Sequence, residues 1–159
     1  MTDALKNYST SVPVSRTLGE ISDMLVRAGA TDVLTSYTPE RRVAAIKFLL
    51  PTPYGQQLFA LPAKVEAVYA VLARQKAQGR NRAGTPVTRE QAERVAWRII
   101  RDWLDAQLAL IETEQAAADQ VLLPYRMIDA DRTVYDAVVE SQGELPTGMR
   151  LALLPEGKA

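Results

Sequence analysis

The sequence predicts one long helix over residues 88–120, and any fold of this 159-residue chain has to accommodate it. Thr88 and Gln91 have the spacing of a capping box, which marks a helix start. At about 1.5 Å per residue, a helix of about 30 residues reaches about 45 Å, which exceeds the width of a compact domain of this size. Its apolar residues wrap more than one face, which favours burial on two sides. They are Val95, Trp97, Ile99, Ile100, Trp103, Leu104, Leu108, Leu110 and Ile111. We therefore expect a homo-oligomeric interface on this helix, formed by Trp97, Ile100, Trp103 and Leu104.

Residues 1–79 have the pattern of a small α+β unit. The segment KNYSTSVPV alternates polar and apolar positions up to Pro13, which is typical of a short edge strand. A helix is expected over residues 16–28, because Thr17 and Glu20 also have capping-box spacing. Three β-like runs follow, TDVLTSY, RRVAAIKFLL and QQLFAL, and the turns between them are TPER and PTPYG.

These three runs predict an antiparallel meander. Its inward face is expected to contain Ile46, Phe48, Leu58 and Leu61. Pro62 suits the first position of a second helix, which Gly79 ends. The apolar stripe of that helix consists of Val65, Val68, Tyr69 and Leu72. The predicted fold is therefore an α+β fold with a β-α-β-β-β-α core, in which helices cover one face of an antiparallel sheet.

Residues 121–159 are expected to form a small C-terminal element of the same single domain, 1–159. VLLPYRM has the composition of a strand broken by Pro124, TVYDAVVE fits a short helix or a strand, and MRLALLP fits a final strand. A chain of this length is the ordinary size of one domain.

The composition excludes whole classes of chemistry. The chain contains no cysteine and no histidine, so thiolate nucleophiles, disulfides, Ser-His-Asp catalysis and zinc sites built on sulfur or imidazole are impossible. None of the five lysines lies in a P-loop or Schiff-base context. The options left for an enzyme are carboxylate-bound magnesium or manganese, a carboxylate pair, or an activated lysine or tyrosine. Of these, acidic metal ligands would need three converging carboxylates. We expect a protein without enzymatic activity, cofactor or metal.

Charge is segregated along the chain although the formal net charge is zero. Residues 74–101 hold eight basic and two acidic side chains, whereas residues 102–159 hold four basic and eleven acidic ones. Such asymmetry indicates a nucleic acid or another charge-complementary partner. Arg94, Arg98 and Arg101 share one face of a helix, and the preceding loop supplies further arginines. The predicted phosphate contacts are Arg80, Arg82, Arg89, Arg94, Arg98 and Arg101.

A second interpretation of this basic segment is at least as well supported by the sequence. Glu90 and Glu93 can pair with Arg94 and Arg89 along the helix, and the acidic C-terminal third can fold back to neutralise the arginines. The segment would then be a solvated, charge-balanced surface. The two interpretations differ in whether the guanidinium groups stay unpaired in the folded protein.

No apolar run approaches the roughly 18 to 20 residues that span a bilayer, and the N-terminus MTDALKNYST lacks the basic and hydrophobic regions of a signal peptide. We expect a cytoplasmic protein with no membrane partner.

Several segments, in this order, resemble a group of small uncharacterised proteins of bacteriophages and mobile elements: KNYSTSVPVSRTLGEISDMLVRAGA, FALPAKVEAVYAVL, ERVAWRIIRDWLDAQLALIE and LLPYRM. The resemblance covers most of the chain and implies a phage protein, but it carries no catalytic residues. Phage genes of this size commonly encode DNA-handling accessories or inhibitors of a host defence.

Two functions are therefore predicted. The first is a non-enzymatic, DNA-binding accessory of phage or mobile-element replication or recombination, in which the basic loop and helix start bind phosphates. The alternative is a protein-interaction module, such as an anti-defence inhibitor or adaptor, that binds a host or phage protein through the long helix.

Overall fold

The computed structural model describes residues 3–143 and has the predicted α+β class, with one three-stranded antiparallel sheet in the described residues. The elements are α1 (Val14–Arg27), β1 (Asp32–Tyr37), β2 (Val43–Thr52), β3 (Gly55–Pro62), α2 (Val65–Ala77), α3 (Arg89–Glu112), α4 (Ala118–Leu122), the 3₁₀ turn η1 (Leu123–Tyr125) and α5 (Val134–Glu140).

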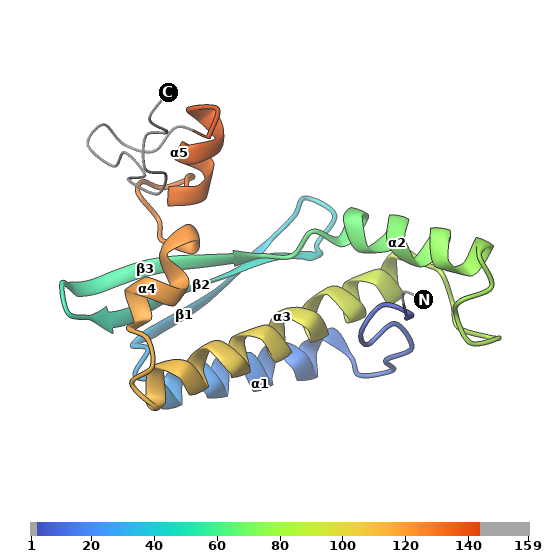
Figure 1. The fold of residues 1–159 in the computed structure, drawn as a ribbon, viewed down its shortest axis with the longest axis horizontal. Helices are drawn as coiled ribbons and strands as arrows, with labels where there is room; N and C mark the ends of the chain where they lie inside the picture. The colour runs from blue at the N-terminus through green and yellow to red at the C-terminus, as the bar shows by residue number, and fades with distance from the viewer. Residues whose placement is uncertain (1–2, 144–159) are drawn as a thin grey trace, which may run out of the picture.

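Helices cover one face of the sheet, as predicted. Figure 1 shows α1 and α3 side by side beneath the strands, with α2 continuing past the end of β3 and lying along the start of α3. The small helix α5 stands on the opposite side of the sheet. Helix α3 therefore contacts the sheet and α1 along one part of its length and α2 along another, which accounts for apolar residues on more than one of its faces.

The register of the sheet decides which strand residues enter the core. Phe48 of β2 is paired with Phe59 of β3, and their rings stack with centroids 5.6 Å apart. Ile46 is paired with Leu61, and all four side chains are buried, which confirms the prediction for Ile46, Phe48 and Leu61. The prediction for Leu58 is wrong: residues three apart in a strand point to opposite faces, so Leu58 lies on the other face and Phe59 takes the inward position.

The prediction of an N-terminal edge strand is also wrong, because residues 3–13 form turns and irregular backbone that pairs with no strand of the sheet. Asn7 has a φ of 61° within a turn. Buried glutamine side chains satisfy the backbone instead: Gln91 Nε2 donates to the carbonyl oxygens of Tyr8 and Thr10 at 3.0 and 2.9 Å, and Gln75 Oε1 accepts from the Leu5 amide at 2.9 Å. The described core order is therefore α-β-β-β-α followed by the long helix.

Helix α1 lies close to the predicted position, but its start is not the predicted capping box. The helix begins at Val14, directly after Pro13. Thr17 is fully buried and Glu20 binds arginines of α3, so both residues serve contacts between helices. Helix α2 does not start at Pro62 as predicted: Pro62 is the last residue of β3, where it pairs with Ala45, and the helix begins at Val65. It ends as predicted, with Gly79 at a φ of 67° after its last turn, and its stripe packs on α3.

Helix α3 stops at Glu112, eight residues before the end of the predicted range 88–120. The Thr113 hydroxyl donates to the Ala109 carbonyl oxygen at 2.7 Å, and Glu114 adopts a φ of 58°. The amide of Gln115 then donates to the Leu110 carbonyl oxygen at 2.9 Å, which closes the helix. With 24 residues the helix is about 36 Å long. It is short enough to lie along the rest of the domain without projecting.

The C-terminal element differs from the prediction in part. VLLPYRM forms α4 and η1, after which Arg126 makes an isolated antiparallel bridge to Phe59. TVYDAVVE forms the helix α5, and the Thr133 side chain caps it by accepting from the Asp136 amide. The predicted strand MRLALLP lies outside the described residues.

Candidate nucleic-acid interface

The basic segment forms one end of the molecule, where the last turn of α2, the loop over residues 78–88 and the first turns of α3 meet the N-terminal segment (Figure 1). Asn81 Nδ2 donates to the Leu72 carbonyl oxygen at 3.1 Å, which fixes the loop to α2. Thr88 caps α3 by accepting from the Gln91 amide at 3.1 Å, as the sequence predicts. The second half of the predicted capping box is not formed, because the Gln91 side chain bonds to Tyr8, Thr10 and Arg94.

Three of the six predicted phosphate contacts are already paired with carboxylates of neighbouring helices. Arg98 Nη1 and Arg101 Nε lie 2.8 and 3.1 Å from the same oxygen of Glu20 on α1. Arg89 Nε lies 2.8 Å from Glu66 of α2, and its guanidinium stacks 4.8 Å above the ring of Tyr69. These arginines join α3 to its neighbours, because α1 and α2 pack on either side of it. They do not belong to an open cationic strip, contrary to the prediction.

The charge cluster around Glu20 and Asp102 is tightly balanced. Burial alone would raise the pKa of Glu20, but the hydrogen bond from Arg98 and the charges of Arg98 and Arg101 outweigh it and lower that pKa. Burial alone would also raise the pKa of Asp102. Hydrogen bonds from Asn7 and Lys6, at 3.0 and 3.1 Å, outweigh this effect and lower that pKa. Both carboxylates therefore stay ionised at neutral pH, and they neutralise the arginines in the middle of α3.

The other basic residues of the segment have no carboxylate partner among the described residues. We call this group the basic end, and it consists of Arg74, Lys76, Arg80, Arg82 and Arg94. Arg80 Nη2 donates to the Asp3 carbonyl oxygen at 2.7 Å, and Arg94 Nη1 donates to Gln91 Oε1 at 3.0 Å. Both bonds hold a guanidinium group in place without cancelling its charge. The structure thus retains Arg80, Arg82 and Arg94 of the six predicted phosphate contacts, together with Arg74 and Lys76 of the same basic segment, which lie on the last turn of α2.

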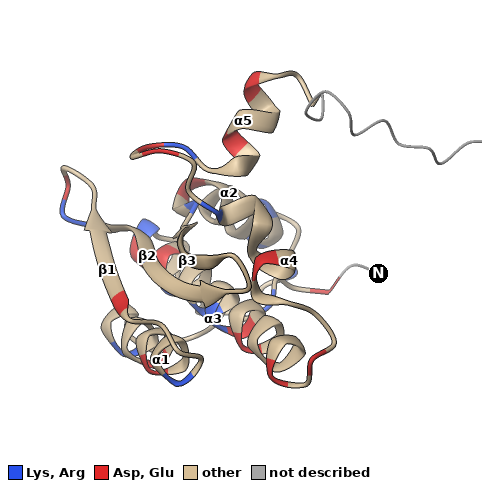
Figure 2. Cartoon of the chain, turned by 90° about the vertical axis from the view of Figure 1, so that its left-hand side faces the viewer, with Lys and Arg blue, Asp and Glu red and all other residues tan. Residues whose placement is uncertain are grey.

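The opposite end of the molecule is acidic. Asp105, Glu112 and Glu114 lie in and after the second half of α3, and Asp119 lies in α4. Figure 2, which views the molecule from this end, shows acidic residues on both elements. No acidic residue of the described C-terminal part pairs with the basic end. Glu20 of α1 and Glu66 of α2 neutralise Arg98, Arg101 and Arg89, and Arg101 also pairs with Asp102 and Asp105 of α3 itself, at 3.3 and 3.5 Å.

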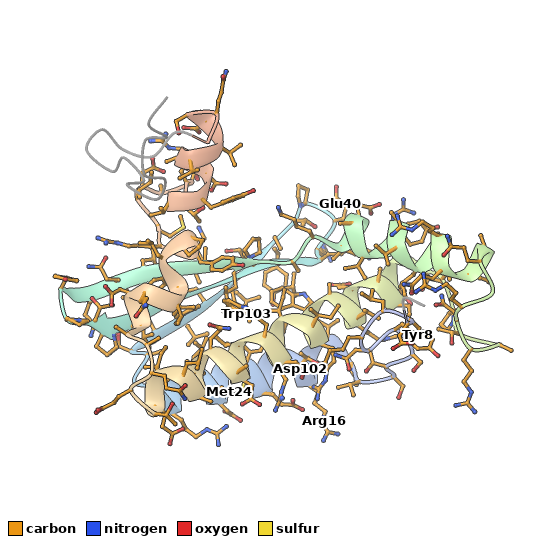
Figure 3. All side chains as sticks on the ribbon, in the orientation of Figure 1. Tyr8, Arg16, Met24, Glu40, Asp102 and Trp103 are labelled. Carbon is orange, nitrogen blue, oxygen red and sulfur yellow. The ribbon has the colours of Figure 1, made fainter. Side chains whose placement is uncertain are left out.

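Two of the four residues of the predicted interface on α3 are not at the surface. Trp97 and Leu104 are 0 % exposed, because the sheet, α1 and α4 cover them. Ile100 and Trp103 are half-buried against the same core, and Trp103 lies between α3 and the sheet (Figure 3). The Trp103 ring packs edge-on against Tyr125 with centroids 5.2 Å apart. Trp97 and Leu104 therefore hold the single chain together and offer no surface to a second copy.

A surface that the sequence analysis did not identify is the outer face of the sheet at β1. Leu34 is 60 % exposed on this face. Tyr37 is 64 % exposed at the end of the strand, after the register shift at Ser36/Tyr37, where it pairs with the buried Val43. The strand order β1-β2-β3 leaves the outer edge of β1 without a partner strand in the described part of the chain. The alternation of DVLTSY is the sequence signal, since every second side chain of this run must face away from the core.

Within residues 3–143, no three acidic side chains come together in a way that could hold a metal ion, and no helix combines the length and the hydropathy needed to cross a membrane. Comparisons of the chain with protein-family models, with curated proteins and with solved structures give no match.

Proposed function

We propose that this protein is a nucleic-acid-binding accessory protein that contacts phosphates through the basic end. The observation that carries the proposal is the group of five basic side chains on one loop and its two flanking helix ends, none of which has a carboxylate partner in the described residues. The resemblance to phage and mobile-element proteins supports a role in replication or recombination.

The residue types favour phosphate contacts over base recognition. Four of the five basic side chains are arginines, whose planar guanidinium groups bind two phosphate oxygens at once. The loop that carries Arg80 and Arg82 contains no aromatic residue for stacking on bases. Binding is therefore expected to be salt-sensitive and nearly independent of sequence.

The test is a titration of fluorescently labelled single- and double-stranded DNA with the full-length protein at low and at physiological salt. We expect binding at low salt that weakens steeply as salt is added, and a further large loss in Arg80→Glu/Arg82→Glu. The matched control is Arg89→Gln/Glu66→Gln, which removes a paired arginine with its partner at the same end and keeps the net charge. Absence of binding at low salt, or equal losses in the variant and the control, would overturn the proposal.

A second function is a protein-interaction module, such as an anti-defence inhibitor or adaptor, and the exposed Leu34 and Tyr37 on β1 favour it. An unpaired strand edge with apolar side chains beside it can accept a strand from a partner, including a second copy of this chain. Light scattering of the wild-type protein and of Leu34→Glu tests self-association. If the wild-type protein is an oligomer and the variant is a folded monomer, β1 and not α3 forms the interface. An oligomer that persists in Leu34→Glu would exclude this surface.

A further inference from the structure

A pocket of about 410 Å³ lies at the basic end, between the N-terminal segment, the loop and the start of α3. Its lining consists of residues 9–11, residues 83–86, Gln91 and Arg94. Known ligand pockets range from roughly 300 to 1,000 Å³, so this one can hold a phosphate group together with the substituent that it esterifies.

The lining of this pocket is polar and carries positive charge. Ser9, Ser11 and Thr85 contribute hydroxyl groups that bond to no other residue in the described part of the chain. Arg94 contributes a cation, and no acidic side chain is among the lining residues that the structure describes. Hydroxyl and guanidinium donors without a competing carboxylate are the groups that bind an oxyanion.

The guanidinium group of Arg94 is held at the pocket by a chain of hydrogen bonds. Arg94 Nη1 donates to Gln91 Oε1 at 3.0 Å. The Gln91 side chain is only 2 % exposed, and its Nε2 donates to the carbonyl oxygens of Tyr8 and Thr10. Both amide hydrogens are thus engaged, which leaves Oε1 facing Arg94. Since only one guanidinium nitrogen is used in this contact, the remaining N–H groups can bind a ligand, and their prior orientation reduces the entropy lost on binding.

Arg94 differs in this respect from the other arginines on α3. Arg98 and Arg101 have similar half-buried positions, but both donate to Glu20. Arg94 has a neutral amide where they have a carboxylate, so its position is fixed and its charge is not compensated. An arginine that is fixed in position and keeps its charge uncompensated suits a binding site for an anion.

We propose that this pocket is a binding site for one phosphate group, with Arg94 as the charged donor and the hydroxyl groups of Ser9, Ser11 and Thr85 as neutral donors. The phosphate could belong to a nucleic-acid strand or to a free phosphorylated small molecule. The site does not depend on binding of a polymer, so it goes beyond the function proposed above.

The test uses the full-length protein and amide ¹H–¹⁵N NMR titrations with thymidine monophosphate, with inorganic phosphate, and with unphosphorylated thymidine as the negative control. We expect saturable shifts of the amides of residues 9–11 and 83–86 with both phosphate compounds and none with thymidine. Arg94→Gln should weaken thymidine monophosphate binding about tenfold or more, as expected for loss of a charged hydrogen bond. Arg27→Gln removes the same charge at the C-terminal end of α1, beside Asp105 and Glu112 and away from this pocket, and it should leave the affinity within about twofold.

A second variant guards against an effect of Arg94→Gln on folding. Ser9→Ala/Ser11→Ala retains the Arg94 charge and removes only two donors, and it should weaken binding several-fold. The proposal is overturned if neither phosphate compound gives saturable shifts, or if Arg94→Gln and Ser9→Ala/Ser11→Ala both bind as tightly as the wild type.

A short single-stranded oligonucleotide separates the two sources of phosphate. If the oligonucleotide displaces thymidine monophosphate from the pocket, the phosphate of a nucleic acid is a ligand. If thymidine monophosphate binds and DNA does not, the ligand is a free phosphorylated molecule and only the nucleic-acid proposal fails. If DNA binds while the pocket amides respond to no phosphate compound, only the pocket proposal fails.

Discussion

The salt dependence of DNA binding should report how many cations of this protein are open to phosphates. Each phosphate that a protein neutralises contributes about −0.9 to the slope of log K against log salt on duplex DNA, and about −0.7 on a single strand. Five residues in the basic end have no carboxylate partner in the described chain, so full contact predicts a slope of about −4.5 on duplex DNA. If all eight basic residues of segment 74–101 were open, the slope would be about −7.2.

These two slopes are easy to distinguish by fluorescence anisotropy. Between about 50 and 200 mM salt, a slope of −4.5 lowers the affinity about 500-fold, whereas −7.2 lowers it about 20,000-fold. Arg82→Gln should reduce the magnitude of the slope by about 0.9, because Arg82 is exposed and in no ion pair with a described residue. The charge-neutral control Arg89→Gln/Glu66→Gln should leave the slope unchanged. A wild-type slope near −7, or equal effects of the variant and the control, would refute the division of the arginines into paired and open groups.

Further expectations concern the packing that positions the basic end and the rest of the domain. Leu122→Ala should lower the free energy of unfolding by about 3 kcal/mol, because the Leu122 side chain is fully buried. Leu123 is 46 % exposed, so Leu123→Ala should lower it by about 0.5 kcal/mol or less. Urea denaturation of the two variants measures both values. Glu20→Gln should cost about 1 kcal/mol at neutral pH. Because the folded-state pKa of Glu20 is below its ordinary 4.5, unfolding takes up a proton in acid, and wild-type stability should fall as the pH drops through and below that value. Denaturation curves should show a smaller fall in Glu20→Gln, and an equal fall would contradict the assigned pKa. Gln91→Met should cost about 2 kcal/mol and speed amide exchange in residues 3–13, since two carbonyl oxygens lose their donor; unchanged exchange would contradict the anchoring role of Gln91.

Local patterns predicted the elements of this fold well where local interactions decide them. The proline- and glycine-containing turns of the meander, the stripe of α2 and the Thr88 cap of α3 are all formed as expected, because each depends on residues within one or two turns. The end of α3 was predicted too late. The segment QAAAD has high helix propensity, but the left-handed backbone of Glu114 and the insertion of Leu122 into the core end the helix first.

The candidate site was predictable only in part, because its charge balance depends on contacts between distant segments. Glu20 lies 78 and 81 positions from Arg98 and Arg101, whereas its spacing from Thr17 predicts a helix cap. The same holds for the N-terminal segment, whose alternation resembles a strand while its backbone is bound by Gln91, more than 80 positions away. Nothing in the local sequence distinguishes an arginine that will be paired from one that will stay open.

The order of charges along α3 has one more consequence. Acidic residues are normally favoured near the start of a helix and basic residues near its end. In α3 the first half carries three arginines and two glutamates, and the second half carries one arginine and three carboxylates, so the net side-chain charge is positive in the first half and negative in the second and adds to the field of the peptide groups. A molecule polarised along its long axis in this way turns in the field of a polyanion before contact, with the loop between α2 and α3 leading. Productive collisions should therefore be more frequent than for random approach, and added salt should slow association as well as weaken the complex.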